Sequence, residues 1–251
     1  MSLARIPTDS RLAAPPPAAP RAIPSPWAAW RLHFERNRRR PMPPAGCRGE
    51  LTPGAAAALA WSLARFQIGE TGEGRIVGAV ARVQMTGVDD DYRRALALFI
   101  AEEGRHARIL AGLIQSLGGT LLASTWTERG FVRLRRLAGI RTKLLVMYAA
   151  EVIGIGFYEA LASALPAGPS HRALRSIAAD ERAHFAFHRR FFRLQAPGGW
   201  RRALFVAAWI VSASGAGAVV LWDHRRTLRA LGLSKARLAR RLLALVARGA
   251  R

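Results

Sequence analysis

Four segments of this chain carry apolar residues at alternating steps of three and four, and acids interrupt the apolar row in each of them. Such steps return to one face of an α-helix, so each segment predicts a helix with a buried face. The segments cover 50–84, 86–119, 141–165 and 171–194. Short links join the first segment to the second and the third to the fourth, whereas residues 120–140 form one long connection. This order predicts an all-α fold, a four-helix bundle with one long crossover connection.

Capping residues support these boundaries. Thr52 is a suitable N-cap with Pro53 at the first helical position, and Asp89 to Asp91 lie near the positive end of the second helix dipole. Gly118 and Gly119 then end that helix. The sequence shows no pair of strands with a hairpin turn.

Three regions follow from composition. Residues 1–45 read as a Pro/Arg-rich N-terminal arm, largely disordered, in which 27–40 predicts a short basic helix. Residues 50–198 form the predicted bundle, and 199–251 a hydrophobic helix plus a basic amphipathic tail. Residues 203–222 carry no charge and are long enough to span a bilayer. Three alternatives stay open for them: a fifth packed helix, membrane association, or a hydrophobic contact in a homodimer.

The chain has 39 basic and 16 acidic residues, a formal net charge of +23. This charge favours anionic partners, namely phospholipid headgroups through the C-terminal tail or nucleic acid, unless it is only solvated surface charge. No nucleic-acid-reading motif is present, which disfavours nucleic acid. The single cysteine, Cys47, excludes a disulfide framework and any multi-cysteine metal site. With no apolar secretory segment near the N-terminus, we expect a cytoplasmic protein, associated with a membrane if the tail binds one.

The acids of the four predicted helices pair by height. Glu70 and Glu103 lie at equal distances from the turn near residue 86, and Glu151 and Glu181 at equal distances from Pro166. Antiparallel neighbours therefore bring each pair to one level. Whether both pairs share that level is not fixed by the sequence.

Two of the helices also carry a Glu-x-x-His motif, Glu103 with His106 and Glu181 with His184. Burying several unpaired carboxylates costs several kcal/mol each, and divalent ions with imidazole ligands remove that cost. One Glu from each of two helices and one Glu-x-x-His from each of the other two describe a dinuclear carboxylate site. The alternative is a bundle with a partly protonated polar core.

The motifs "EEGRH" (102–106) and "DERAH" (180–184), with "GE" in the first helix and "AE" in the third, resemble the ferritin-like di-iron carboxylate proteins over residues 55–195. That superfamily includes bacterioferritin, rubrerythrin and di-iron oxygenases. The resemblance implies metal ligands Glu70, Glu103, His106, Glu151, Glu181 and His184. It also implies that Glu102 and Asp180 hydrogen-bond a metal-bound histidine on another helix.

Four further residues lie near the predicted site. Glu73, one turn beyond Glu70, is an alternative ligand or a hydrogen-bonding neighbour of the ligands. His188 is a third nitrogen ligand, a proton relay or a core histidine. Tyr148, one turn before Glu151, and Tyr158, two turns after it, serve either packing or redox chemistry.

The resemblance implies a ferritin-like dinuclear-iron oxidoreductase that activates O2, an oxygenase or oxidase with a small organic substrate and an external electron donor. Two Fe ions are expected, with Fe/Mn or two Mn as alternatives. Ile177 stands where the superfamily's aromatic N-oxygenases have another histidine, which argues against that chemistry. The competing functions are a ferroxidase or peroxide scavenger without organic substrate, and a basic structural or nucleic-acid-binding bundle with a vestigial site.

Overall fold

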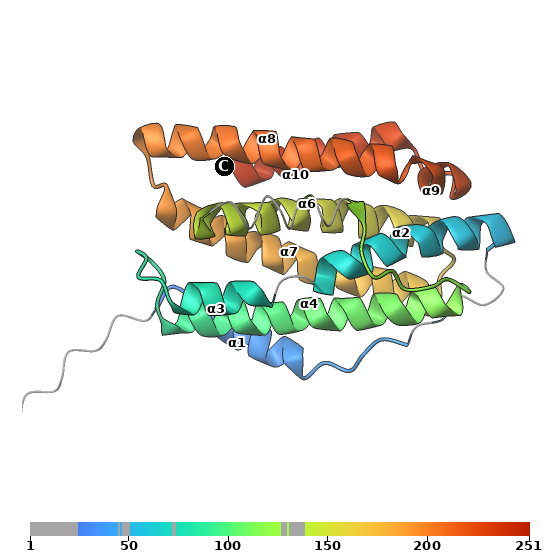
Figure 1. Cartoon of the computed structure of the whole chain (residues 1–251), viewed down its shortest axis with the longest axis horizontal. Helices are drawn as coiled ribbons and strands as arrows, with labels where there is room; N and C mark the ends of the chain where they lie inside the picture. Colours follow the sequence, from blue (N-terminus) through green and yellow to red (C-terminus); the bar gives the residue numbers. More distant parts are fainter. Residues whose placement is uncertain (1–24, 45, 47–50, 72–73, 127–129, 131–138) are drawn as a thin grey trace, which may run out of the picture.

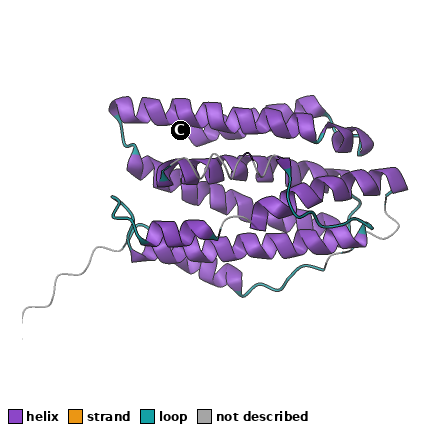
Figure 2. Ribbon diagram, in the orientation of Figure 1, coloured by secondary structure: helices purple, strands orange, loops and turns teal. Residues whose placement is uncertain are grey.

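The computed structural model describes residues 25–44, 46, 51–71, 74–126, 130 and 139–251. Its regular structure is helical throughout, with no strand in the described part of the chain (Figure 2), so the all-α prediction is confirmed. The helices are α1 (Ala28–Arg38), α2 (Pro53–Thr71), α3 (Arg75–Ala81), α4 (Asp90–Ser116), α6 (Ile140–Ala164), α7 (Pro169–Gln195), α8 (Gly199–Asp223), α9 (Arg225–Ala230) and α10 (Lys235–Ala250).

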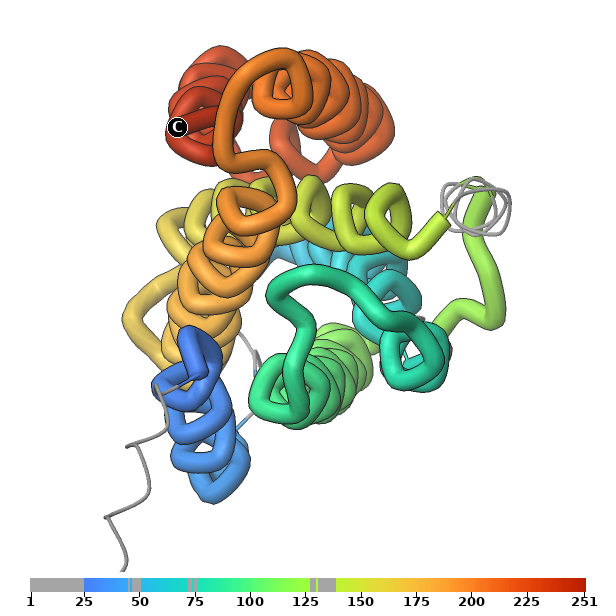
Figure 3. Tube along the Cα trace, turned by 90° about the vertical axis from the view of Figure 1, so that its left-hand side faces the viewer, coloured from blue at the N-terminus to red at the C-terminus, as the bar shows by residue number. Residues whose placement is uncertain are grey.

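Helices α2, α4, α6 and α7 enclose the centre of the molecule (Figures 1 and 3). Helix α6 packs along α7, and α2 packs along α4. The interior between them holds fully buried aromatic rings, among them Phe99 of α4, Tyr158 of α6 and Phe191 of α7. The long apolar faces read from the sequence therefore meet in one core.

Three of the four predicted helices have nearly the expected boundaries. Helices α6 and α7 begin and end within two residues of prediction. The carboxylate of Asp89 caps α4 by accepting a hydrogen bond from the Tyr92 N–H at 2.8 Å. Gly118 follows the end of α4 with φ 74°, in the left-handed region that glycine adopts without strain.

The first predicted helix, over 50–84, is wrong in its extent. Helix α2 ends at Thr71, and a separate short helix, α3, begins at Arg75. Glycines at 69, 72 and 74 explain the division, because glycine is the least favourable helix residue after proline. Residues 72 and 73 lie outside the described residues, and with them the candidate Glu73.

The N-terminal arm is structured where it is described. Helix α1 lies within the short helix predicted for residues 27–40 and packs against α4 (Figure 1), so this part of the arm is helical and not disordered. The side chains of Trp27 and Phe34, seven residues apart, are buried, and the Trp27 indole donates a 2.7 Å hydrogen bond to the Gly87 carbonyl. Two large apolar side chains on one face provide the driving force. Residues 1–24 lie outside the described part.

Helices α8, α9 and α10 form an outer layer (Figure 3), in which α8 and α10 pack on α6 and α9 packs on α2. Two helices in the described residues are long and apolar enough to cross a membrane, α6 and α8. The apolar stretch of α6 is 72% buried inside the protein, as expected of a core helix, whereas that of α8 is only 17% buried. Residues 203–222 therefore pack on the bundle, but few of them are fully buried and a set of them is exposed.

Phe34→Ala tests whether α1 is an integral part of the core. Deleting a buried ring should lower the free energy of unfolding by about 3–5 kcal/mol. Leu32→Ala, on the same helix but 49% exposed, should change it by about 0.5 kcal/mol or less. Urea denaturation followed by circular dichroism measures both. Equal effects of the two substitutions would show that α1 is not packed as described.

Candidate metal centre

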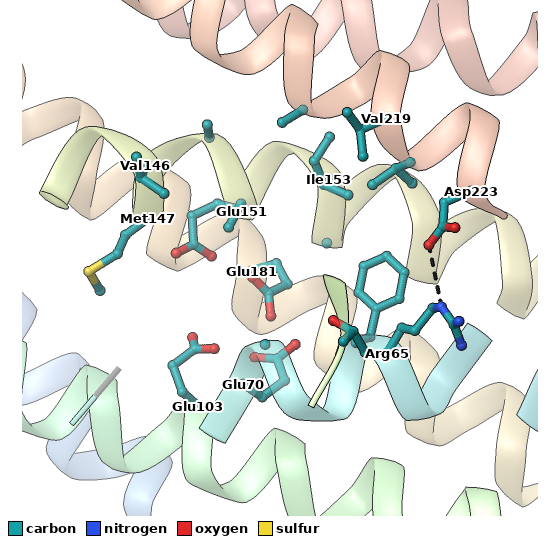
Figure 4. Close-up of a pocket in the computed structure, with 18 of the residues that line it drawn as sticks. Arg65, Glu70, Glu103, Val146, Met147, Glu151, Ile153, Glu181, Val219 and Asp223 are labelled. Carbon is teal, nitrogen blue, oxygen red and sulfur yellow. Dashed lines mark ion pairs between the residues drawn. The ribbon is translucent and has the colours of Figure 1, made fainter. Parts of the chain in front are cut away.

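Six ionisable side chains converge in the interior between the four central helices. Two of them are single glutamates, Glu70 near the end of α2 and Glu151 of α6. The other four form a Glu-x-x-His pair on each remaining helix, Glu103 with His106 on α4 and Glu181 with His184 on α7. Figure 4 shows the four carboxylates turned toward one another. Both histidines are fully buried, and the glutamate side chains are 10% exposed or less.

Both imidazoles present Nδ1 to the carboxylates. His106 Nδ1 lies 3.1 Å from Glu181 Oε1, and His184 Nδ1 lies 2.7 Å from Glu103 Oε1. None of these four buried atoms has a partner in hydrogen-bond geometry among the described residues. One ligand atom from each residue lies within 4.8 Å of all the others. The group could therefore hold a metal ion, and a cation would satisfy atoms that are otherwise unpaired.

The cluster has two similar halves. The glutamates of the two motifs lie near both imidazoles. Of the two motif imidazoles, Glu70 lies near that of His106, with Oε2 at 4.0 Å from Nδ1, and Glu151 lies near that of His184, with Oε2 at 3.6 Å from Nδ1. Each half thus has one imidazole and one carboxylate of its own, and the halves share two carboxylates.

A crossed pair of hydrogen bonds holds the imidazoles from behind. His106 Nε2 lies 3.2 Å from Asp180 Oδ2, and His184 Nε2 lies 3.1 Å from Glu102 Oε2. Each acid precedes the glutamate of the opposite motif, so the bonds tie α4 to α7 in both directions. These are the contacts that the superfamily resemblance implies. They leave Nδ1 of each ring as the atom available to a metal.

Arg40, which follows α1, links Glu102 and Asp180, the two outer acids that bond the imidazoles from behind. Its Nη2 lies 2.9 Å from Glu102 Oε1 and 2.5 Å from Asp180 Oδ1. Arg105 adds a contact to Asp180 at 3.4 Å and donates to the Pro41 carbonyl at 3.0 Å. Two arginines therefore balance the charge of two acids. Arg40 was not predicted from the sequence, because it is one of five arginines between residues 31 and 40. Nothing in this segment indicates which of them turns inward.

The electrostatics of the cluster favour proton uptake when no cation is bound. Burial, and next the neighbouring motif glutamate, raises the pKa of Glu70 and of Glu151 well above the usual range. Burial alone would lower the pKa of His106, but the hydrogen bond to Asp180 and the nearby carboxylates of Glu181 and Glu103 raise it to about 9. Protons thus supply positive charge that a bound metal would supply instead, so metal binding should release protons.

His188 lies one turn beyond His184 and beside the cluster. Its Nε2 is 3.6 Å from Glu151 Oε1, beyond hydrogen-bond range, and neither ring nitrogen has a partner among the described residues. Burial, and next the charge of His184, lowers the pKa of His188 to about 3. The ring is therefore neutral and hydrogen-bonds neither to the cluster nor to the surrounding core.

The two tyrosines differ in their contacts. The Tyr158 hydroxyl donates a 2.5 Å hydrogen bond to Glu70 Oε1 and so orients that carboxylate. The Tyr148 hydroxyl instead donates to the Gly249 carbonyl of α10 at 3.4 Å, and its ring stacks on Trp209 at 4.0 Å between centroids. Tyr148 therefore packs against the C-terminal layer and makes no contact with the carboxylates.

Gly154 is a site residue that sequence reasoning missed. A Cβ at this position would lie 3.1 Å from both Cδ and Oε2 of Glu181, closer than the carboxylate tolerates without moving. The signal was present, since Gly154 lies three residues after Glu151 and hence on the same face of α6. The absence of a side chain here makes room for the Glu181 carboxylate.

A cavity of about 250 Å³ adjoins the cluster (Figure 4). The four glutamates line one end, and α6 and α8 supply apolar walls such as Ile153 and Val219. At the other end Arg65 Nε lies 3.4 Å from Asp223 Oδ2. The cavity therefore offers an apolar space that reaches the carboxylates.

Comparison of the chain with protein-family models, with curated proteins and with solved structures gives no match. Function is therefore inferred from the geometry of the cluster and of its surroundings.

Gly154→Ala tests the close approach of α6 to Glu181. The new methyl group should displace the carboxylate by a few tenths of an ångström and weaken metal affinity by about tenfold or more. Isothermal titration with Mn²⁺ or anaerobic Fe²⁺ measures the affinity.

Gly104→Ala is the matched control, because its Cβ would meet only the flexible end of Arg108 at 3.7 Å. It should leave metal affinity unchanged and stabilise α4 by about 0.5–1 kcal/mol. Unchanged affinity in Gly154→Ala would show that the position of Glu181 does not matter for binding.

Proposed function

We propose that this chain is a ferritin-like dinuclear-iron oxidoreductase that activates O2 and oxidises a small, largely apolar organic substrate. The observation that carries the proposal is the doubled arrangement of the cluster. Two carboxylates lie near both imidazoles, and each imidazole has one further carboxylate of its own. One imidazole and one carboxylate per ion, with two carboxylates between the ions, suit a dinuclear centre.

Charge balance supports two ions. Four carboxylates neutralise two divalent cations, whereas one cation would leave negative charge uncompensated in the core. The two outer acids do not enter this balance, because Arg40 and Arg105 already pair with them. Carboxylate and imidazole ligands accept Fe and Mn alike, so metal availability contributes to the choice.

Two iron ions bound here would supply the electrons that reduce O2 and the oxidising power that acts on the substrate. The residues of the chain prepare that chemistry. The crossed acids fix the imidazole orientation, and Tyr158 holds Glu70. The one cysteine of this sequence cannot form a multi-cysteine iron site, so we expect an external donor to supply the electrons of each turnover.

The cavity favours an organic substrate over a purely inorganic reaction. Its apolar walls lead from the carboxylates toward the Arg65–Asp223 pair, so they offer an apolar substrate a place next to the cluster. A ferroxidase needs only a path for ions, for which an apolar cavity is unfavourable. We therefore place the oxygenase or oxidase before the ferroxidase.

Metal analysis tests the ligand set. The purified chain loaded anaerobically with Fe²⁺ should hold two irons, and Glu103→Ala or Glu181→Ala should lower the content by an order of magnitude. Glu159→Ala is the control, since Glu159 pairs with Arg182 and Arg241 away from the cluster. Anomalous scattering identifies the element. Unchanged iron in both cluster variants would refute the assignment.

Oxygen uptake tests the reaction. With a chemical reductant present, the Fe²⁺-loaded chain should consume O2 over multiple turnovers only when an apolar substrate or a cell extract of small molecules is added. A stoichiometric uptake that stops once the iron is oxidised, and that no extract changes, would instead establish a ferroxidase. No uptake by a fully loaded chain would exclude both.

A further inference from the structure

Helix α8 exposes an apolar stripe along its whole length. Exposed residues recur at steps of three and four, at positions 200, 204, 207, 211, 215, 218 and 222. The large exposed apolar side chains of the helix are Trp200, Leu204, Ile210, Val211 and Trp222, between 45% and 73% exposed. No charged residue occurs from 203 to 222. From Trp200 to Trp222 the stripe measures about 33 Å at the rise of an α-helix. Monomeric soluble proteins rarely expose a continuous apolar surface of this length without a partner.

Tryptophan and arginine mark both ends of the stripe. The guanidinium of Arg201 lies 5.6 Å from the ring centre of Trp200, and that of Arg225 lies 4.8 Å from Trp222. Exposed Arg226 and Arg229 follow on α9. Tryptophan prefers the boundary between lipid chains and headgroups, and arginine beside it reaches the phosphates.

The outer layer, residues 199–251, is strongly basic. Residues 199–251 contain eleven Lys and Arg but a single acid, Asp223. Its carboxylate pairs with Arg65 and is only 10% exposed, so it does not offset the positive surface. Helix α10 lies beside α8 in this layer (Figure 3) and exposes Arg237, Arg240 and Arg248. An apolar stripe within a basic surface complements an anionic phospholipid bilayer.

The buried side of α8 determines how it would meet a bilayer. Trp209 is fully buried, and its indole donates a 2.8 Å hydrogen bond to the Val246 carbonyl of α10. Ala213 and Gly217 are buried on the same side. A helix surrounded by lipid would lose these contacts, whereas a helix lying in the plane of the surface keeps them. In-plane docking is therefore the arrangement that this packing allows.

A second copy of the chain is a poorer partner for the stripe. Arginines flank both ends, so two α8 helices packed along each other bring like charges together in the parallel and in the antiparallel orientation. Such juxtaposition opposes association. We propose that α8 docks the protein in-plane onto a membrane surface rich in anionic phospholipid, with its apolar stripe in the headgroup region and the arginines of α8, α9 and α10 on the phosphates.

Vesicle flotation with the full chain tests this inference, which does not depend on the metal. The protein should float with phosphatidylcholine vesicles that contain one third phosphatidylglycerol, bind pure phosphatidylcholine vesicles much more weakly, and lose affinity as salt rises. Leu204→Asp with Val211→Asp should weaken binding at least tenfold. Leu32→Asp, an exposed leucine of α1 on the opposite side (Figure 1), should leave binding unchanged.

Charge variants and an extraction step complete the test. Arg226→Gln and Arg229→Gln should each lower affinity for the phosphatidylglycerol vesicles about fivefold, and circular dichroism confirms folding of every variant. An alkaline carbonate wash should release the protein, and resistance to it would overturn the in-plane arrangement. Failure of the native chain to float would overturn the membrane partner. So would a native dimer in sedimentation equilibrium that binds no vesicles and that the Leu204→Asp, Val211→Asp double substitution dissociates. Iron content, measured in parallel, tests the metal centre separately.

Discussion

The crossed hydrogen bonds behind the two imidazoles determine much of what surrounds them. Asp180 holds His106 and Glu102 holds His184, so each motif is completed by the helix opposite. The acids need positive charge in turn, which Arg40 supplies from the N-terminal segment. Burying a charged acid without such a partner costs about several kcal/mol. Packing of α1 on α4 and the orientation of Nδ1 are therefore parts of one electrostatic arrangement.

The sequence predicted those features that depend on spacing along a helix. The three-and-four periodicity located α4, α6 and α7. Equal distances from the two turns predicted that the acids would meet in pairs, and the six expected ligands do converge. That both pairs share one level could not be predicted, because it depends on how the two helix pairs dock. No local pattern records that docking.

Other features escaped prediction for identifiable physical reasons. Arg40 reaches Asp180 across 140 positions of the sequence, and a run of arginines carries no information about such a contact. Gly154 matters through the space it leaves for Glu181, a property of two helices together. The end of α2 at Thr71 was obscured because apolar periodicity continues past glycines that end the helix. Periodicity reports burial, whereas continuity of a helix also depends on backbone propensity.

Helix α8 joins the two proposals through its two faces. Its inner side chains, Ser212, Ala216, Val219 and Val220, line the cavity that reaches the carboxylates. Its outer face is the apolar stripe. One helix diameter, about 10 Å, therefore separates the cavity from the surface proposed to meet lipid. If both proposals hold, a substrate dissolved in the bilayer needs only a local displacement of α8 to enter. Ser212 and Ala216, the small residues among these four, favour such a displacement, because they interlock less with α6 than large side chains would.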